Sequence, residues 1–350
     1  MALGDSAAAR IPVPDREAAR QAAERNARLT KPPGALGRLE PLVATLAGQQ
    51  GTPTPAVERV SIAVFAADHG VCDEGVSAFP QDVTAQMIRN FAGGGAAISV
   101  LARELGAGLE VVNVGARQPV EALPGVLDAS VASGTRNLAR EPAMSASECN
   151  AALAVGDAAA ARAAESGSQL FIAGDMGIGN TTSAAAVACA LLGAPVADLV
   201  GRGTGVDDAG LARKHTAVAR GLDRHGGDTD PMAVLASLGG LEIAAITGAI
   251  LGAAHRGIPV LVDGFIVSVA ALVAVRHAPD AAAWLHFGHR SAEAGHDRVL
   301  AGLEADPLLD LGMRLGEGSG AAVAVSVLRS ACAVHAGMAT FDEAGVSDGS

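Results

Sequence analysis

A glycine-rich stretch at residues 174–182 is the part of this sequence best suited to bind a ligand. It reads Gly-Asp-Met-Gly-Ile-Gly-Asn-Thr-Thr, follows the apolar run 170–173 and opens onto the apolar run 183–192. This order predicts a strand, a loop and a helix, and the first backbone N–H groups of such a helix can bind a phosphate. The alternative is a tight strand-to-helix turn that binds nothing.

The spacing of these glycines excludes two common nucleotide loops. No lysine precedes Thr181, so the stretch is not a Walker A loop. The pattern G-x-x-G-x-G also differs from the G-x-G-x-x-G of dinucleotide-binding folds. The sequence therefore disfavours a dinucleotide-dependent oxidoreductase.

Two ionisable residues could take part in chemistry. Glu317 lies between Gly316 and Gly318, and its uncovered backbone suits a general base held against a ligand. It equally suits a surface turn. Lys214 lies on a predicted helix that follows a second glycine loop, at 201–205, and it is either a functional cation or a solvated lysine.

Further polar groups follow other apolar runs of the chain. Open α/β sheets bind ligands at the carboxyl ends of their parallel strands. The polar ends are Asp68-His69-Gly70 after 60–67, Asp263-Gly264 after 258–262, and His289-Arg290-Ser291 after 282–287. For Asp68 and His69 the alternative is that they cap each other's loop.

We expect no metal site among His286, His289 and His296. The first two would point to opposite faces if the strand continues through them. No pair of carboxylates completes a common set of ligands.

Buried strands at 60–67, 110–115 and 169–174 alternate with helices, which predicts an α/β fold with a doubly wound, mostly parallel sheet. Residues 1–57 have the composition of separate helices that are broken at Lys31-Pro32-Pro33-Gly34. The simplest expectation for Lys31 is a solvated loop residue.

The composition restricts the partners. A net charge of −12, with no Tyr and one Trp, argues against nucleic acid and an anionic membrane surface. The apolar runs 238–254 and 258–275 are interrupted by Glu242 and Asp263, so we expect buried sheet and helix rather than membrane spans. Four separated cysteines and an N-terminus without an apolar leader segment predict a cytoplasmic protein.

Several motifs, in this order, resemble those of the nicotinate-nucleotide–dimethylbenzimidazole phosphoribosyltransferase family, from about residue 25 to about residue 345. They are Lys31-Pro32-Pro33-Gly34-x-Leu36-Gly37-Arg38-Leu39-Glu40, Asp68-His69-Gly70 with Gly75-Val76-Ser77, the 174–182 loop, Gly203-Thr204-Gly205, His289-Arg290-Ser291-Ala292-Glu293 and Arg314-Leu315-Gly316-Glu317-Gly318.

The resemblance implies an activity. The family transfers the 5-phosphoribosyl group of nicotinate mononucleotide to 5,6-dimethylbenzimidazole, with inversion at the anomeric carbon, and gives nicotinate and α-ribazole 5′-phosphate for the lower ligand of cobalamin. It implies a homodimer with neither metal nor organic cofactor. It also implies a Rossmann-like domain, here 58–324, and a small helical domain built from 1–57 and 325–350.

The resemblance also assigns roles to residues. Glu317 would be the general base, Lys214 aligns with a functional lysine, and Asp175 replaces a residue that is often Glu, so it either stabilises the ribosyl cation or supports the loop. The phosphate and ribose would be held by Gly177, Gly179, Asn180, Thr181, Gly203, Asp263, Gly264 and Ser291. The benzimidazole would contact Phe79, Gln86, Met313 and Leu315. The alternative function is a non-catalytic protein that binds a nucleotide or a benzimidazole.

Overall fold

The computed structural model describes residues 10–347 and contains one six-stranded sheet in which every neighbouring pair of strands is parallel. The strand order is β3-β2-β1-β4-β5-β6. The strands are β1 Val60–Ala67, β2 Gly108–Gly115, β3 Val126–Asp128, β4 Leu170–Met176, β5 Val260–Val262 and β6 Leu285–Phe287. The predicted α/β, doubly wound sheet is confirmed. The expected absence of a leader segment falls partly on residues 1–9, which lie outside the described residues.

The central strand β1 is buried on both faces. Ile62 and Val64 pack into one apolar cluster, whereas Ala63 and Phe65 pack into another on the opposite face. Successive side chains of a strand point to opposite faces, so a strand between two helical layers must be apolar at every position.

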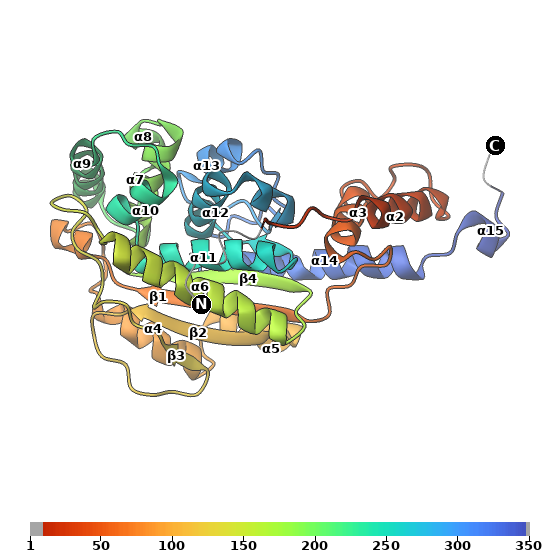
Figure 1. Cartoon of the computed structure of the whole chain (residues 1–350), viewed down its shortest axis with the longest axis horizontal. Coiled ribbons are helices and arrows are strands. Elements are labelled where there is room, and N and C mark those ends of the chain that lie inside the picture. Colours follow the sequence, from red (N-terminus) through yellow and green to blue (C-terminus); the bar gives the residue numbers. More distant parts are fainter. Residues whose placement is uncertain (1–9, 348–350) are drawn as a thin grey trace.

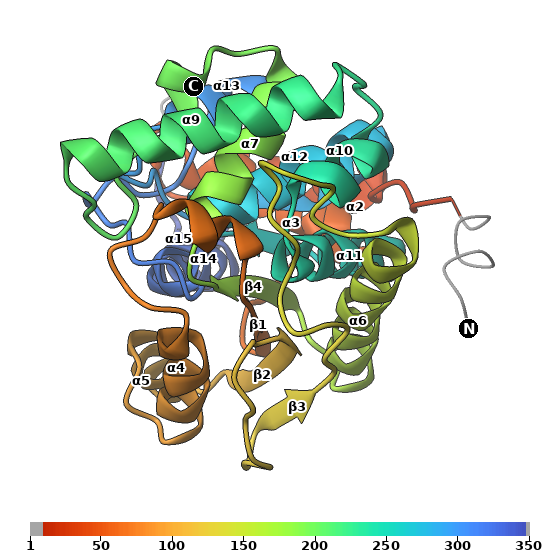
Figure 2. The same ribbon diagram turned by 90° about the vertical axis from the view of Figure 1, so that its left-hand side faces the viewer.

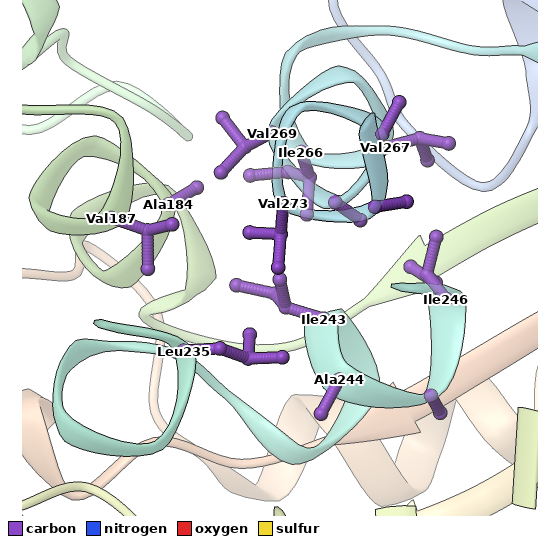
Figure 3. Close-up of a cluster of buried hydrophobic side chains, with 14 of the residues drawn as sticks. Ala184, Val187, Leu235, Ile243, Ala244, Ile246, Ile266, Val267, Val269 and Val273 are labelled. Carbon is purple, nitrogen blue, oxygen red and sulfur yellow. The ribbon is translucent and has the colours of Figure 1, made fainter. Parts of the chain in front are cut away.

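One face of the sheet is covered by a layer of largely apolar helices. These are α6 Ala146–Glu165, α7 Asn180–Leu192, α10 Pro231–Leu238, α11 Leu241–His255 and α12 Phe265–His277. Figure 3 shows side chains of α7, α10, α11 and α12 meeting in this layer, among them Val187, Leu235, Ile243 and Val273. The runs 238–254 and 258–275 are therefore buried sheet and helix, as expected.

The opposite face packs against α3 Leu39–Gln50, α4 Asp82–Ala92, α5 Ala97–Leu105 and α14 Ser319–Gly337. Figure 1 shows α14 running from the sheet to α3 and to α2 Arg16–Arg28. By length and composition α14 could cross a membrane, but half of its apolar window is buried inside the protein. The helix α14 continues through residues 324 and 325 without a break. The division of the chain into two domains at residues 57 and 325 stays a prediction.

The remaining elements lie around these layers. They are η1 Gly70–Glu74, α8 Val196–Leu199, α9 Asp208–His225, η2 Pro279–Trp284, α13 His296–Gly302 and α15 Phe341–Ala344. Figure 2 shows α9 crossing the molecule above the sheet, where it packs against α7.

Lys31 is not solvated. It is buried, and its Nζ donates to Glu40 Oε1 at 2.8 Å. The same oxygen accepts the backbone N–H of Leu36, so the ion pair fastens the loop to the start of α3.

Candidate active site

A cavity of about 270 Å³ lies at the carboxyl ends of β4, β5 and β6. Because the strands are parallel, the loops that follow them open on the same edge of the sheet. The cavity is lined by Asp175, Asn180, Thr181, Gly203, Thr204, Gly264, Phe265, Ile266, His289, Ser291, Glu293, Arg314, Leu315 and Gly316.

The cavity brings together about half of the residues that the sequence singles out. Those in its lining are Asp175, Asn180, Thr181, Gly203, Gly264, Ser291 and Leu315. The others are not part of the lining: Gly177, Gly179, Asp263, Lys214, Glu317, Met313, Phe79 and Gln86. Several of these still contact lining residues, whereas Phe79 and Gln86 have exposed side chains on another part of the chain.

Glu317 and the glycine loop touch each other within one chain. The backbone N–H of Glu317 donates to the carbonyl oxygen of Asp175 at 3.2 Å. A β-carbon at Gly174 would overlap the carbonyl oxygen of Glu317. Close backbone contact therefore explains the glycine at 174, without any phosphate.

The Glu317 side chain is buried, which rules out the surface turn. Its Oε2 accepts the backbone N–H of Ile98 at 3.2 Å, at the N-terminus of α5. Burial raises the pKa of Glu317 above its ordinary value, the Ile98 N–H opposes this shift, and the charge of Asp263 adds to it. The Glu317 carboxylate therefore has an increased affinity for a proton.

Asp175 lies against the same loop and faces the cavity. Its Oδ2 accepts from the Asn180 side-chain amide at 2.9 Å. Burial raises the pKa of Asp175 to about 8, and the neighbouring Asp263 and Glu242 carboxylates act in the same direction. These effects favour the protonated form of Asp175.

Lys214 is a buried cation, not a solvated lysine. Its Nζ donates to Thr181 Oγ1 at 2.9 Å, and it lies close beside Gly203. Burial lowers the pKa of Lys214 to about 8, although the charge of Glu293 opposes this shift. The positive charge of Lys214 therefore lies next to the Thr181 hydroxyl, in the first turn of α7.

Asp263 connects β5 to α14. Its Oδ1 accepts the backbone N–H of Ala321, in the first turn of α14, and lies 3.5 Å from His289 Nε2. Gly264, the next residue, lines the cavity. The carboxylate thus holds the helix that follows Glu317 against the end of β5.

The three histidines have separate partners. His286 binds the Gln49 side chain, His289 approaches Asp263, and His296 Nδ1 accepts the backbone N–H of Ser291. Among residues 10–347, no group of three or more His, Cys, Asp or Glu side chains is arranged to hold a metal ion. The role of His296 is to fix the backbone at Ser291.

A buried pair that the sequence did not predict lies beneath the glycine loop. His69 Nε2 and Glu242 Oε1 are 2.6 Å apart, and a β-carbon at Gly177 would come within 3.0 Å of that oxygen. Asp68 instead accepts from the Thr84 hydroxyl and from a backbone N–H. Asp68 and His69 thus have different partners, and the alternative that they cap each other's loop does not hold.

Glu293 and Arg314 are two further lining residues to which sequence reasoning gave no role. Glu293 Oε1 accepts the N–H of Gly203 at 3.1 Å, and Arg314 Nη1 donates to the Gly203 carbonyl oxygen at 3.1 Å. Both belong to motifs that carry the family resemblance, which was the available signal.

The residues predicted for the benzimidazole are not gathered in one pocket. Leu315 lines the cavity and is 59% exposed, and the carbonyl oxygen of Met313 accepts the N–H of Ala292. Phe79 is 49% exposed near the start of α4, the helix that carries Gln86. Their role stays a prediction.

Similarity to known proteins, in sequence and in structure, shows to which class of protein this chain belongs. A family model described as "Phosphoribosyltransferase" matches residues 11–346. The chain is 60% identical to the nicotinate-nucleotide–dimethylbenzimidazole phosphoribosyltransferase of Pseudomonas aeruginosa strain UCBPP-PA14, over 95% of both chains. It is 56% identical to the enzyme of that name from Xanthomonas axonopodis pv. citri, over 96% of this chain and 97% of the other. The crystal structure of CobT from Thermus thermophilus superposes with a TM-score of 0.92 at 48% identity, covering 95% of this chain and all of the other.

Fold, cavity and family model together define a phosphoribosyltransferase. The chain belongs to the nicotinate-nucleotide–dimethylbenzimidazole phosphoribosyltransferase family, and the resemblance carried by its motifs is confirmed. The relatives are named as enzymes, so a non-catalytic binding protein and a dinucleotide oxidoreductase are both set aside.

Proposed function

We propose that the protein transfers the 5-phosphoribosyl group of nicotinate mononucleotide to 5,6-dimethylbenzimidazole and inverts the anomeric carbon. The observation that carries this proposal is the buried carboxylate of Glu317, whose backbone is bonded to Asp175 at the wall of the cavity. One ring nitrogen of benzimidazole attacks the anomeric carbon while the other loses its proton to Glu317. Nicotinate leaves as a neutral pyridine ring and needs no strong acid.

The 5′-phosphate is assigned to the cavity wall formed by Thr181, Gly203 and Ser291, with the buried Lys214 behind Thr181. Gly177, Gly179 and Asn180 form the turn that opens α7, and Asp263 and Gly264 lie on the ribose side. Asp175 faces the positively charged pyridinium of the substrate, and that charge favours the carboxylate form. Metal and organic cofactor have no role in this scheme.

The test is the reaction itself. Purified protein mixed with nicotinate mononucleotide and dimethylbenzimidazole should produce α-ribazole 5′-phosphate, identified by mass and chromatography. Glu317→Gln keeps an oxygen that can accept the Ile98 N–H, so we expect it to fold and bind nicotinate mononucleotide while turnover falls by about 10²–10⁴-fold. Glu304→Gln is the matched control, because Glu304 is the other described non-glycine residue with a positive φ and is exposed. Equal turnover of Glu317→Gln and the wild type would remove Glu317 as the base.

We also propose that the enzyme acts in the cytoplasm as a homodimer. The four cysteines are free thiols, as reducing conditions require, and the dimer rests on the family resemblance. Light scattering should give twice the mass of one 34.6 kDa chain. The mass of a single chain across the working concentrations would contradict the dimer.

A further inference from the structure

The Glu293 carboxylate accepts a hydrogen bond from a backbone N–H of the proposed phosphate site. Its Oε1 accepts the N–H of Gly203 at 3.1 Å, and both residues line the cavity. A β-carbon at Gly201 would overlap the same oxygen, so the glycine loop fits closely around this carboxylate. A phosphate bound to Gly203 and the Glu293 carboxylate in its present place exclude each other.

The conflict is confined to Gly203. Thr181 Oγ1 accepts from Lys214, and Ser291 Oγ accepts the N–H of Glu293 at 3.3 Å. A hydroxyl that accepts a hydrogen bond keeps its own hydrogen to donate, whereas a backbone N–H has only one hydrogen. Thr181 and Ser291 can therefore bind a phosphate at once, but Gly203 must first release Glu293.

The charges around Gly203 also indicate that Glu293 takes the place of a bound anion. Lys214 lies beside Gly203, and Arg314 donates to the Gly203 carbonyl oxygen. The negative charge of Glu293 raises the pKa of Lys214, against the effect of burial. Glu293 thus balances the positive charge of Lys214 beside Gly203.

We propose that Glu293 is a resident anion of the phosphate site, which the phosphate of the substrate displaces from the Gly203 N–H. The inference rests on the proposed function and adds to it a cost that every phosphate bound at Gly203 must overcome. Inorganic phosphate must displace the carboxylate with no other contacts to offset the loss, whereas a phosphoribosyl substrate also gains contacts to its ribose and ring. The cost of displacement is the same for every phosphate, so it weakens the binding of inorganic phosphate, whereas the ribose and ring contacts keep the substrate bound.

The experiment compares charge with shape at position 293. Glu293→Gln keeps the size of the side chain and an oxygen that can accept from Gly203, but removes the charge. Glu293→Asp keeps the charge on a shorter side chain. Asp297→Asn is the matched control, because it removes one charge from an exposed carboxylate outside the cavity lining. Inorganic phosphate is titrated into each protein in a calorimeter, and KM and kcat are measured for nicotinate mononucleotide.

We expect Glu293→Gln to bind inorganic phosphate about 3- to 10-fold more tightly than the wild type. The KM of Glu293→Gln for nicotinate mononucleotide should fall as well, without a rise in kcat. Glu293→Asp should bind inorganic phosphate more weakly than Glu293→Gln. The phosphate affinity of Asp297→Asn should stay within about twofold of the wild type. A purely structural residue would show unchanged or weaker phosphate binding on loss of its charge. Either of those results for a folded Glu293→Gln overturns the proposal.

A second measurement needs no variant. In crystals of the wild-type protein with inorganic phosphate, a phosphate oxygen should replace Glu293 Oε1 at the Gly203 N–H. A phosphate bound in the cavity with the Glu293–Gly203 hydrogen bond intact would also overturn the proposal. Absence of α-ribazole 5′-phosphate in the wild-type assay would instead refute the proposed function, so the two failures are distinguishable.

Discussion

Burial shifts the two ionisable groups beside the α7 loop in opposite directions. It raises the pKa of Asp175 to about 8 and lowers the pKa of Lys214 to about 8. Each shift favours the neutral form of its group, because charge is poorly solvated in the interior. The affinity of the site for an anion and the stability of the empty protein should therefore both change near pH 8.

The affinity for the phosphorylated substrate should depend on the charge of Lys214. Below its pKa of about 8 Lys214 is an ammonium ion behind Thr181, and above that pH it becomes neutral. We expect KM for nicotinate mononucleotide to rise by about 10-fold as pH increases through 8. In Lys214→Met, KM should be high and should no longer rise as pH increases through 8. A wild-type KM that stays constant across pH 8 would show that the phosphate does not sense this charge.

The stability of the protein should depend on the protonation of Asp175. Its pKa is raised from 3.8 to about 8, so the folded state holds a proton that the unfolded chain has lost between these values. Burial of Asp175 therefore costs nothing below pH 3.8, costs more as pH rises, and has its full cost above pH 8.

Asp175→Asn removes this cost, and its oxygen can still accept from the Asn180 amide. At a pH above 8 we expect its free energy of unfolding to exceed that of the wild type by about 1–3 kcal/mol, with the difference vanishing toward pH 4. Denaturant unfolding at both pH values measures it. A difference independent of pH would mean that packing, and not the proton, sets the effect.

At the scale of elements, α13 is followed by a residue with an unfavourable backbone conformation. Glu304 follows the last turn of α13 with φ 53°, a conformation that costs a non-glycine residue about 1 kcal/mol. Its side chain is exposed. Glu304→Gly should therefore raise the free energy of unfolding by about 0.5–1 kcal/mol, as measured by denaturant titration. Glu304→Ala keeps the strain and should not; equal stabilisation by both would locate the effect in the lost carboxylate.

The elements with strong patterns could be predicted from the sequence. The strands predicted at 60–67, 110–115 and 169–174 are β1, β2 and β4. The edge strand β3 was missed, because three partly exposed residues carry no periodic pattern. The helix α13 was missed as well, since its seven residues follow a polar motif that looked like a loop.

The site was predictable where a motif lies in one segment, and not where partners come from distant segments. The loop at 174–182 and Glu317 were found, but the sequence does not show that the backbone of Glu317 bonds to Asp175. Glu242 stands in an apolar run, and its partner His69 is 173 residues away. A carboxylate inside a buried helix is the signal that it needs a distant partner.

At the scale of the whole molecule, the N-terminal helix α3 shares a buried core with the sheet. Leu42, Val43 and Leu46 of α3 belong to the same apolar cluster as Ile62 and Val64 of β1. Buried residues of α14 belong to this cluster as well. A domain with its own core would not share buried side chains with the central strand of another. This packing argues that the helices from both ends of the described chain unfold together with the sheet.

Leu46→Ala tests this directly, because Leu46 is fully buried in that shared cluster. The cavity left by the truncated side chain should lower the free energy of unfolding by about 2–4 kcal/mol. If the helices and the sheet form one cooperative unit, calorimetry will show a single transition that moves as a whole to lower temperature. Leu311→Ala, the same change at a side chain that is 61% exposed, should leave the transition nearly in place. Two transitions in the wild type, with only the smaller one shifted by Leu46→Ala, would instead establish 1–57 and 325–350 as an independent domain.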